Sequence, residues 1–253
     1  MHIHISQAAR VKRIGRIMNL KLLVSLPLVC CVFPQGLTVP PPIVRIVSTP
    51  GVSGRPGRSL GCPKAAVEIL GLAAATGAPQ TWTLEMHPTF GSIEDLDQAV
   101  NATPLAGLTN DSRAMIAVLQ LGWSYRPDDA VRALPKARYI RVTIHRIRPG
   151  AEADFGGLAR LHKMTSDRFN SGQPDMFYHV VSGDDSGTYI VLSPLASLRV
   201  LDEGPADAPA DAAAEAKAAD IENSREHYLF RVDPGLSCVS EGFAAGDPGF
   251  WHP

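Results

Sequence analysis

Apolar and polar residues alternate over residues 139–145, just before a turn and a segment of helical spacing. The alternation places Ile140, Val142 and Ile144 on one face of a strand and polar side chains on the other. The polar set consists of Tyr139, Arg141, Thr143 and His145. An Arg-Pro-Gly turn follows at 148–150. The pattern predicts a strand over residues 138–148 and a helix over 151–168.

The predicted helix carries one apolar stripe, which needs an apolar partner. The stripe consists of Phe155, Leu158, Leu161 and Met164. We expect it to pack on the face formed by Ile140, Val142 and Ile144. The polar set would then face a second sheet and line an interior, where a buried Arg141 would need a hydrogen-bond partner.

The segments that follow continue the pattern with alternating strands and turn residues. Strands are predicted at 176–181 and 188–193, and the Gly-Asp-Asp-Ser-Gly sequence at 183–187 suits a hairpin turn with positive φ angles better than a calcium loop. A short helix over 195–201, an Ala/Asp-rich linker with an exposed helix ending near Ile221, and a strand at 228–232 complete the series. The order is β-α-β-β-α-β, the ferredoxin-like arrangement.

Weak echoes of this series occur in the same order in the first half of the chain. Residues 81–98 resemble 188–203, residues 110–125 resemble 223–238, and "RPGR" at 55–58 resembles "RPGA" at 148–151. The first copy is about 12 residues shorter between its first helix and its Thr-aromatic strand. Because a strand and turn occupy the corresponding interval of the second copy, we predict that the first copy lacks one strand.

These segments resemble the dimeric α+β barrel superfamily, which includes antibiotic-biosynthesis-monooxygenase-like and NIPSNAP-like proteins. The residues that carry the resemblance are "YIRVTIHRIRPGAEADFGGL" and "FYHVVSGDDSGTYIVLSPLASL", with their echoes in the first half. The resemblance covers about residues 43–240 and is greatest to an exported bacterial branch with two units per chain. It implies an α+β fold in which tandem ferredoxin-like (βαββαβ) units form an α+β barrel.

The pattern divides the chain into a leader, two units and short connecting segments. The boundaries are 1–36 for a signal peptide with an alternative start at 18, 37–42 for a Pro-rich lead-in, 43–127 for a degenerate first unit, 128–137 for a linker, 138–240 for the second unit and 241–253 for a C-terminal tail.

The N-terminal segment is typical of an export signal. Residues 1–36 hold five basic and no acidic residues, and an apolar run at 20–33 is too short to span a bilayer as a helix. We therefore expect an exported protein, periplasmic or extracellular, with no stable membrane span after processing. Cys62 and Cys238 are the two cysteines outside this segment. They could pair in an oxidising compartment, but spacing alone cannot show that they lie close enough, and two separate buried thiols are the favoured interpretation.

The charge balance bears on the kind of partner. Beyond residue 36 the chain carries 19 basic and 25 acidic residues, a net charge of −6. An acidic body without a basic patch argues against nucleic acid as a partner. A small-molecule ligand is the expected partner, and a homodimer is an open alternative.

Six residues are candidates for a ligand site, and the family's motifs assign none of them a catalytic role. They are Tyr139, Arg141, Thr143, His145, His179 and Tyr189. Arg141 could hold a substrate carboxylate through two hydrogen bonds, or pair with an acidic residue of the other unit. Tyr139 and Tyr189 could stack on a flat ligand or fill a core.

The two histidines could serve as a base or a metal ligand, but hydrogen-bonded or exposed histidines are the favoured interpretation. His145 and His179 lie on strands that the ferredoxin-like order separates by a third, and neither belongs to a metal-ligand motif. No metal and no cofactor are expected.

Two classes of function fit these observations. The first is an exported protein that binds a small hydrophobic or aromatic ligand or acts without catalysis. The alternative is a cofactor-free monooxygenase or isomerase of the antibiotic-biosynthesis-monooxygenase type, or a haem-binding protein. Because a fold does not determine a function, the sequence leaves open whether the chain is an enzyme.

Overall fold

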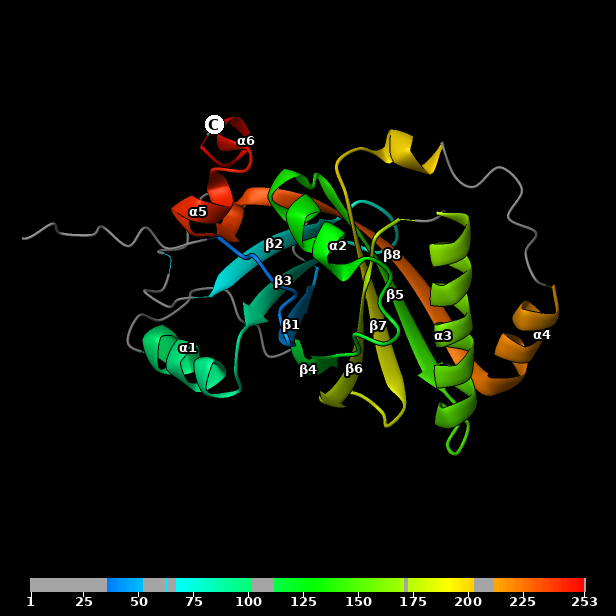
Figure 1. Ribbon diagram of the computed structural model, residues 1–253. Coiled ribbons are helices and arrows are strands. Elements are labelled where there is room, and N and C mark those ends of the chain that lie inside the picture. The colour runs from blue at the N-terminus through cyan, green and yellow to red at the C-terminus, as the bar shows by residue number, and fades with distance from the viewer. Residues whose placement is uncertain are drawn as a thin grey trace, which may run out of the picture. The chain divides into compact units, whose positions relative to one another are not determined.

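Eight antiparallel strands close into a barrel in the computed structural model (Figure 1). The structure describes residues 36–51, 62, 67–101, 112–170, 173–202 and 212–252, and all elements below belong to the unit Phe33–Pro253. The strands are β1 (Ile43–Pro50), β2 (Glu68–Ala74), β3 (Gln80–His87), β4 (Arg113–Leu119), β5 (Tyr139–Ile147), β6 (Met176–Ser182), β7 (Thr188–Leu195) and β8 (Glu222–Cys238). The helices are α1 (Gly91–Asn101), α2 (Pro127–Ala133), η1 (Leu134–Lys136), α3 (Glu152–Phe169), η2 (Leu198–Leu201), α4 (Ala212–Ile221), α5 (Glu241–Ala244) and α6 (Pro248–Trp251).

The strand order around the barrel is the same in both halves of the chain. The full order is β1-β3-β2-β8-β5-β7-β6-β4. Within each half the strands follow the spatial order fourth, first, third, second: β4-β1-β3-β2 in the first half and β8-β5-β7-β6 in the second. The halves join where β2 pairs with β8 and where β4 pairs with β6. The predicted α+β barrel of ferredoxin-like sheets is therefore confirmed.

The prediction that the first half lacks a strand is wrong. Strand β2 occupies the interval in question, and it is buried over Glu68–Leu72. Its short sequence, EILGLAA, contains Gly71 and lacks the alternation that marks β5. What the first half lacks, among the residues that the structure describes, is a counterpart of α3. The difference in length falls between the first and second strands, which are separated by residues 51–67 in the first half and by residues 148–175 in the second.

The two faces of β5 are opposite to each other, as predicted, but their assignment is reversed. Ile140, Val142 and Ile144 belong to the core inside the barrel, together with residues from all eight strands. Tyr139, Arg141, Thr143 and His145 alternate with them and face outward. An eight-stranded barrel has an interior just wide enough to be filled by side chains. Apolar residues fill it here, so the polar face of the strand turns toward the helices.

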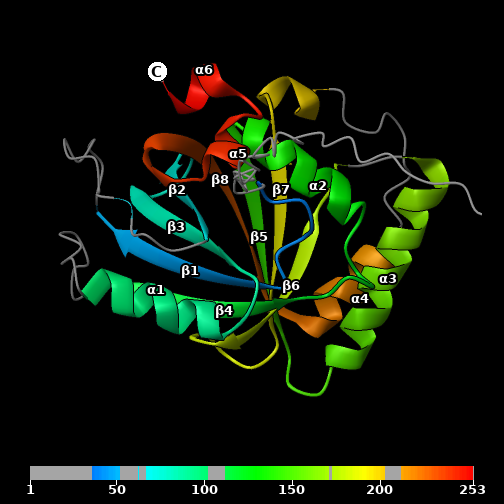
Figure 2. The ribbon, with the colours of Figure 1, turned by 60° about the vertical axis from the view of Figure 1, so that its left-hand side comes forward.

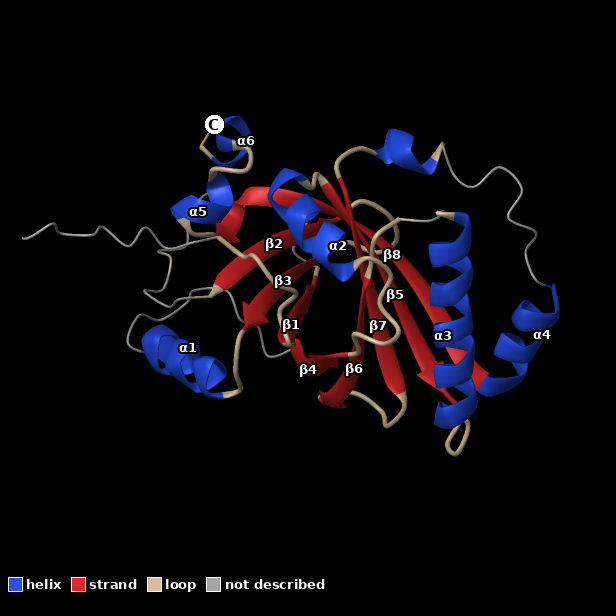
Figure 3. Ribbon diagram, in the orientation of Figure 1, coloured by secondary structure: helices blue, strands red, loops and turns tan. Residues whose placement is uncertain are grey.

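Helix α3 lies along the outer side of the second sheet, with α4 beside it (Figures 1 and 3). The predicted helix at 151–168 is confirmed, but its apolar stripe is only partly buried. Phe155 packs against outward-facing residues of the sheet, whereas Leu161 and Met164 are 46% and 66% exposed. Helix α1 covers the first sheet on the side of β1 and β4 (Figure 2).

The hairpin between β6 and β7 has the predicted turn. Gly183 and Gly187 have φ angles of 93° and 80°, which side chains with a Cβ rarely adopt. A Cβ at Gly183 would also lie 2.0 Å from the carbonyl oxygen of Ala114 in β4. The turn residues therefore allow β6 to approach β4, where the two halves join.

The segments expected as a linker and a tail are built into the fold. Of the predicted linker at 128–137, residues 128–136 lie in α2 and η1, and Ala130 and Val131 are fully buried. At the C-terminus, Phe243 and Trp251 join the core, and the indole of Trp251 donates a 2.7 Å hydrogen bond to the Pro135 carbonyl. These segments cover one end of the barrel.

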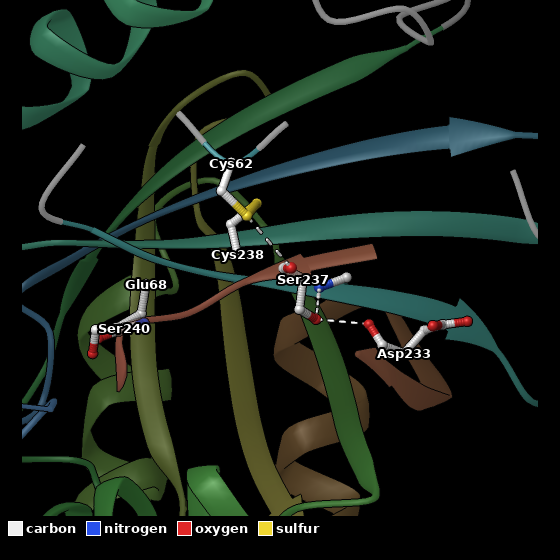
Figure 4. The surroundings of a disulfide bond; sticks show 7 residues. Cys62, Glu68, Asp233, Ser237, Cys238 and Ser240 are labelled. Carbon is white, nitrogen blue, oxygen red and sulfur yellow. Dashed lines mark hydrogen bonds between the residues drawn. A yellow bond between two sulfur atoms is a disulfide. The ribbon is translucent and has the colours of Figure 1, made fainter. Parts of the chain in front are cut away.

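Cys62 and Cys238 form a disulfide, so the interpretation as two separate thiols is wrong (Figure 4). Their Cα atoms are 5.3 Å apart, within the normal range for a disulfide. The register of β2 and β8 places Cys238 opposite Ile69, so the bond lies where the two halves pair. Next to it, the Ser237 hydroxyl accepts a 2.9 Å hydrogen bond from the amide of Gly71 and donates a 2.7 Å bond to the Asp233 carbonyl.

Candidate functional site

The six predicted site residues lie on one surface, the outward face of β5, β6 and β7. This surface continues onto β8, and we call it the outer face. Strand register orders it into rows: Arg141 lies opposite Ser193, Thr143 opposite Val191, and His145 opposite Tyr189. On the other side of β5, Thr143 lies opposite His227. The residues predicted to line a shared interior thus lie together, but between the sheet and α3.

His145, Tyr189 and His179 form a single row across three strands. Tyr189 of β7 lies between the two histidines, as the ferredoxin-like order predicts. The ring of His179 stacks on that of Tyr189 with centroids 4.8 Å apart, and His145 packs against Phe155 of α3 at 5.2 Å. The two imidazoles are therefore separated by the tyrosine.

An aromatic cluster surrounds this row. It consists of Trp123, Phe155, Phe177, Tyr189, His145 and His179. Trp123 contacts Tyr189 and Phe177, with centroid distances of 5.2 and 5.5 Å. A Cβ at Gly156 would lie 2.6 Å from the Trp123 ring, so α3 needs glycine at this position. The aromatic rings give the outer face an apolar region beneath the start of α3.

Polar residues on β5 and β8 are paired with each other on the same face. His145 Nδ1 lies 3.1 Å from Glu222 Oε1, and Glu222 also accepts hydrogen bonds of 2.8 and 2.9 Å from Arg225. Burial raises the pKa of Glu222, but the hydrogen bonds and charges of His145 and Arg225 more than offset this, so its pKa is lowered. Thr143 Oγ1 lies 3.2 Å from His227 Nδ1.

Arg141 differs from Arg146, the other arginine of β5, which is paired with Asp184 and Glu226. It is half-buried, and no residue that the structure describes makes a hydrogen bond or ion pair with its guanidinium. Its positive charge nevertheless influences three neighbours on different elements: Asp175 before β6, His162 on α3 and His227 on β8. Arg141 therefore stands as an unneutralised cation at the centre of the site.

The histidines near Arg141 favour the neutral form. The pKa of His162 is lowered by desolvation of its ring, although the residue as a whole is exposed, and further by the charges of His145 and Arg141. The pKa of His227 is lowered by desolvation and then by neighbouring cations, among them Arg225 and Arg141. An added anion would relieve this excess of positive charge.

Asp175 lies at the far end of the row that contains Arg141 and Ser193. It is 8% exposed, and burial raises its pKa to about 6, although a hydrogen bond from the Tyr125 amide and the charges of Arg141 and Lys163 oppose the shift. That bond joins Tyr125 N to Oδ1 at 2.9 Å. Within the described part of the chain, Oδ2 has no hydrogen-bond partner.

Tyr125 is nearly fully buried beside Asp175. Its backbone makes hydrogen bonds in both directions with Asp175, at 2.9 and 2.8 Å. Its hydroxyl is buried and has no hydrogen-bond partner. Every other buried side-chain nitrogen or oxygen of the described residues has one. Buried polar atoms are almost always paired, so an orphaned hydroxyl indicates strain or a missing partner.

The first half contains an arginine at the same place in its sheet. Arg45 lies opposite Glu85 with the same register as Arg141 opposite Ser193, because Ile43 pairs with His87 as Tyr139 pairs with Leu195. Arg45 Nε lies 2.6 Å from Glu85 Oε2, and its Nη1 lies 2.6 Å from Asp97 Oδ1. Burial opposes the charge of Arg45, but the two carboxylates raise its pKa. Arg45 is thus neutralised twice, whereas Arg141 faces a serine.

The neutralised arginine belongs to a buried network. Glu85 Oε2 also lies 3.2 Å from Nε2 of His87, which is fully buried. His87 Nδ1 lies 3.1 Å from the Ser92 hydroxyl, which in turn donates to the Thr89 carbonyl at 2.6 Å. These contacts attach α1 to the first sheet. The guanidinium of Arg45 is already paired with two carboxylates, so it is not free to bind the carboxylate of a ligand.

Two further observations concern the described residues. They contain no group of three or more His, Cys, Asp or Glu side chains that could hold a metal ion. Among the helices described, none has the length and apolar character required to cross a membrane.

Sequence reasoning missed several residues of the site: Trp123, Tyr125, His162, Asp175, Ser193 and His227. Alternation could have found three of them, since Asp175 precedes Phe177 and His179 by steps of two, Ser193 follows Tyr189 and Val191, and His227 lies between Arg225 and Leu229. Tyr125 and Trp123 lie outside the strands, where no periodicity indicates their direction.

The fold and the site define a class, an α+β barrel protein whose candidate site lies between the outer face of one sheet and its helix. No family model and no curated protein matches the sequence. Solved structures with a similar fold include an anthrone oxidase-like protein, with 9% identity and a TM-score of 0.49 over 79% of this chain and 94% of that chain. A mutant chlorite dismutase from Candidatus Nitrospira defluvii has 10% identity and a TM-score of 0.45 over 81% and 95% of the chains. A heme-binding protein from Thermus thermophilus has 12% identity and a TM-score of 0.44 over 78% and 95%. These likenesses concern the fold alone.

Proposed function

We propose that this chain is an exported α+β barrel protein that binds a small organic carboxylate with an aromatic or other apolar body. The binding site is the outer face around Arg141. One observation carries the proposal: Arg141 has no partner among the described residues, whereas its counterpart Arg45 is held by two carboxylates.

The first half supplies a template for the ligand's charged group. Glu85 places a carboxylate on Arg45 across one strand pair, and Ser193 occupies the equivalent position in front of Arg141. Serine is shorter than glutamate and uncharged. Arg141 therefore lacks the carboxylate that Glu85 supplies to Arg45, and a ligand could supply it instead. Arginine recognises carboxylates through paired hydrogen bonds, and a half-buried guanidinium loses less of that energy to water than an exposed one.

The surroundings of Arg141 indicate the rest of the ligand. Tyr139 lies next to Arg141 on the outer face of β5, and the aromatic cluster begins two rows away at Tyr189 and His145. Aromatic side chains favour flat apolar partners through offset or edge contacts. A carboxylate with a phenyl-sized body therefore matches the charge and the apolar lining together.

A binding measurement tests the proposal. Phenylacetate and phenylpyruvate should raise the melting temperature of the protein, whereas neutral phenylacetamide should not. Arg141→Met should abolish the response at unchanged or slightly increased stability, because it removes an uncompensated half-buried charge. Arg160→Met, which changes an exposed arginine of α3, is the control and should bind normally. A response to phenylacetamide, or full binding by Arg141→Met, would contradict the proposal.

Ser193→Glu extends the same test by supplying the missing carboxylate from within. The new side chain would stand before Arg141 as Glu85 stands before Arg45, so phenylacetate binding should be lost while the fold is kept. Binding that survives in this variant would count against Arg141 as the anchor. A Soret shift on adding haem, with no response to any carboxylate, would favour haem binding instead.

Export is supported by the basic and apolar N-terminal segment and by the disulfide, since disulfides persist in oxidising compartments. In protein purified from its native host, we expect a mature N-terminus near Val39 and a peptide in which Cys62 and Cys238 remain cross-linked. Intact-mass measurement and peptide mapping without reduction check both points. An intact terminus at Met1 or Met18, with both thiols free to alkylate, would remove this part of the proposal.

A further inference from the structure

Asp175 is the chemically reactive group of the site that ligand binding alone leaves unexplained. We propose that Asp175 accepts and returns a proton on a 2-oxo carboxylate held by Arg141, so that the chain catalyses keto–enol isomerisation of its ligand. This inference rests on the proposed function, because it requires the ligand's carboxylate to be fixed by Arg141.

The arrangement of the sheet brings the two groups to one ligand. Arg141 lies on β5, Ser193 lies opposite it on β7, and Asp175 directly precedes the first registered residue of β6, Met176. Neighbouring strands are about 4.8 Å apart, so the backbones of Arg141 and Asp175 are separated by about 10 Å. The small side chain of Ser193 lies between them. A three-carbon acid on the guanidinium would extend over Ser193 toward the Asp175 carboxyl.

The surroundings of Asp175 suit a proton acceptor that also gives its proton back. The charged or titratable groups around it are Tyr125 from the loop before α2, Arg141 from β5 and Lys163 from α3. Oδ1 is fixed by the Tyr125 amide, while Oδ2 has no partner among the described residues. Burial raises the pKa of Asp175 to about 6, near the pH at which a general base works best. One oxygen thus positions the carboxyl and the other is available to a ligand.

The reaction needs no oxidant, reductant or metal. The C3–H bond of the 2-oxo acid breaks, and its proton goes to Asp175 Oδ2. The electron pair of that bond forms the C2=C3 double bond, and the carbonyl oxygen takes up the negative charge. A proton from a neighbouring hydroxyl or water then completes the enol, and the reverse sequence restores the ketone. Ligand and product are isomers, and Asp175 is regenerated by release of its proton.

The unpaired hydroxyl of Tyr125 is a second, independent observation. The hydroxyl belongs to the same residue whose amide holds Asp175, and it is buried without a partner among the described residues. A ligand oxygen would satisfy it, as buried hydroxyls require. If it contacts the ligand, Tyr125→Phe should weaken phenylpyruvate binding or exchange without weakening phenylacetate binding, since phenylacetate lacks the carbonyl oxygen.

Hydrogen exchange at C3 of phenylpyruvate tests the inference. In D₂O buffer, proton NMR should show that the protein accelerates loss of the C3 signal over buffer alone, with a rate that rises as the pH passes about 6. Asp175→Asn should keep the Arg141-dependent melting shift but lower the accelerated rate at least ~100-fold. Asp95→Asn, at an exposed position of α1, is the matched control and should exchange like the parent protein.

The outcomes separate this inference from the proposed function. Binding of phenylpyruvate that Arg141→Met abolishes, with no accelerated exchange or with undiminished exchange in Asp175→Asn, would overturn the isomerase and leave the binding protein. Absence of any Arg141-dependent binding would overturn both.

Discussion

Replacing Glu85 with serine, the residue that the second half carries at the equivalent position, is expected to lower the free energy of unfolding by ~3–5 kcal/mol. Glu85 is 7% exposed and contacts both Arg45 and His87. Removing one partner of a buried ion pair leaves the other charge desolvated and uncompensated. Arg45 keeps only its bond to the more exposed Asp97, which places the expected loss toward the lower end of this range.

Urea unfolding at pH 7 measures this effect, and Glu94→Ser is the control. Glu94 lies in the first turn of α1, the helix that also carries Asp97, and is exposed, so its replacement should cost well under ~1 kcal/mol. If Glu85→Ser and Glu94→Ser lose similar stability, the ion pairs of Arg45 do not stabilise the fold. The difference between a paired Arg45 and an unpaired Arg141 would then no longer indicate a ligand site at Arg141.

Asp175→Asn is expected to stabilise the protein by ~2–3 kcal/mol at pH 8 and to leave it nearly unchanged at pH 4. The pKa of Asp175 is raised from 3.8 to about 6 in the folded protein, so ionisation is harder in the folded than in the unfolded chain. The folded state pays no penalty below pH 4. The penalty grows as the pH rises from about 4 and is complete above about 6. Asparagine can still accept the bond from Tyr125 N without carrying a charge.

Urea unfolding of both proteins between pH 4 and pH 8 checks the sign. The parent protein contains other carboxylates, so the informative quantity is the difference between parent and variant, with Asp95→Asn treated in the same way. A variant that is less stable than its parent at pH 8 would show that the ionised carboxylate is stabilised where it lies. A gain in stability on loss of the charge is typical of functional groups, whose placement costs folding energy.

The sequence predicts the fold better than the orientation of its sheets. Alternation in β5 correctly separated Ile140 from Arg141, because side chains of a strand point to opposite faces by geometry alone. It could not decide which face turns inward, since Phe155 of α3 can pack on an apolar strand face or on the aromatic rings that it meets here. The small interior of an eight-stranded barrel excludes the charged face, a constraint that appears only once closure is known.

The site shows the same limit. Arg141 is recognisable from sequence as a carboxylate anchor, but its lack of a partner is not, because Glu85 and Ser193 become comparable only through strand register. The strand β2 was missed because its apolar run, interrupted by Gly71, has neither the alternation nor the β-branched content of its neighbours. Pairing with β3 and β8 stabilises it instead.

The disulfide makes the two junctions between the halves unequal. At one junction, β2 and β8 are fastened covalently by Cys62–Cys238 next to the pair Ile69–Cys238. At the other, β4 and β6 are held by backbone pairing, and the strand register shifts once at each junction, between Ile69 and Gly71 and between Ile116 and Ala117. The barrel is therefore cross-linked covalently at the β2–β8 junction, whereas the β4–β6 junction depends on backbone pairing. Because the disulfide holds β2 to β8, we expect local opening of the barrel to occur between β4 and β6 rather than between β2 and β8, which would release the strand that follows Asp175.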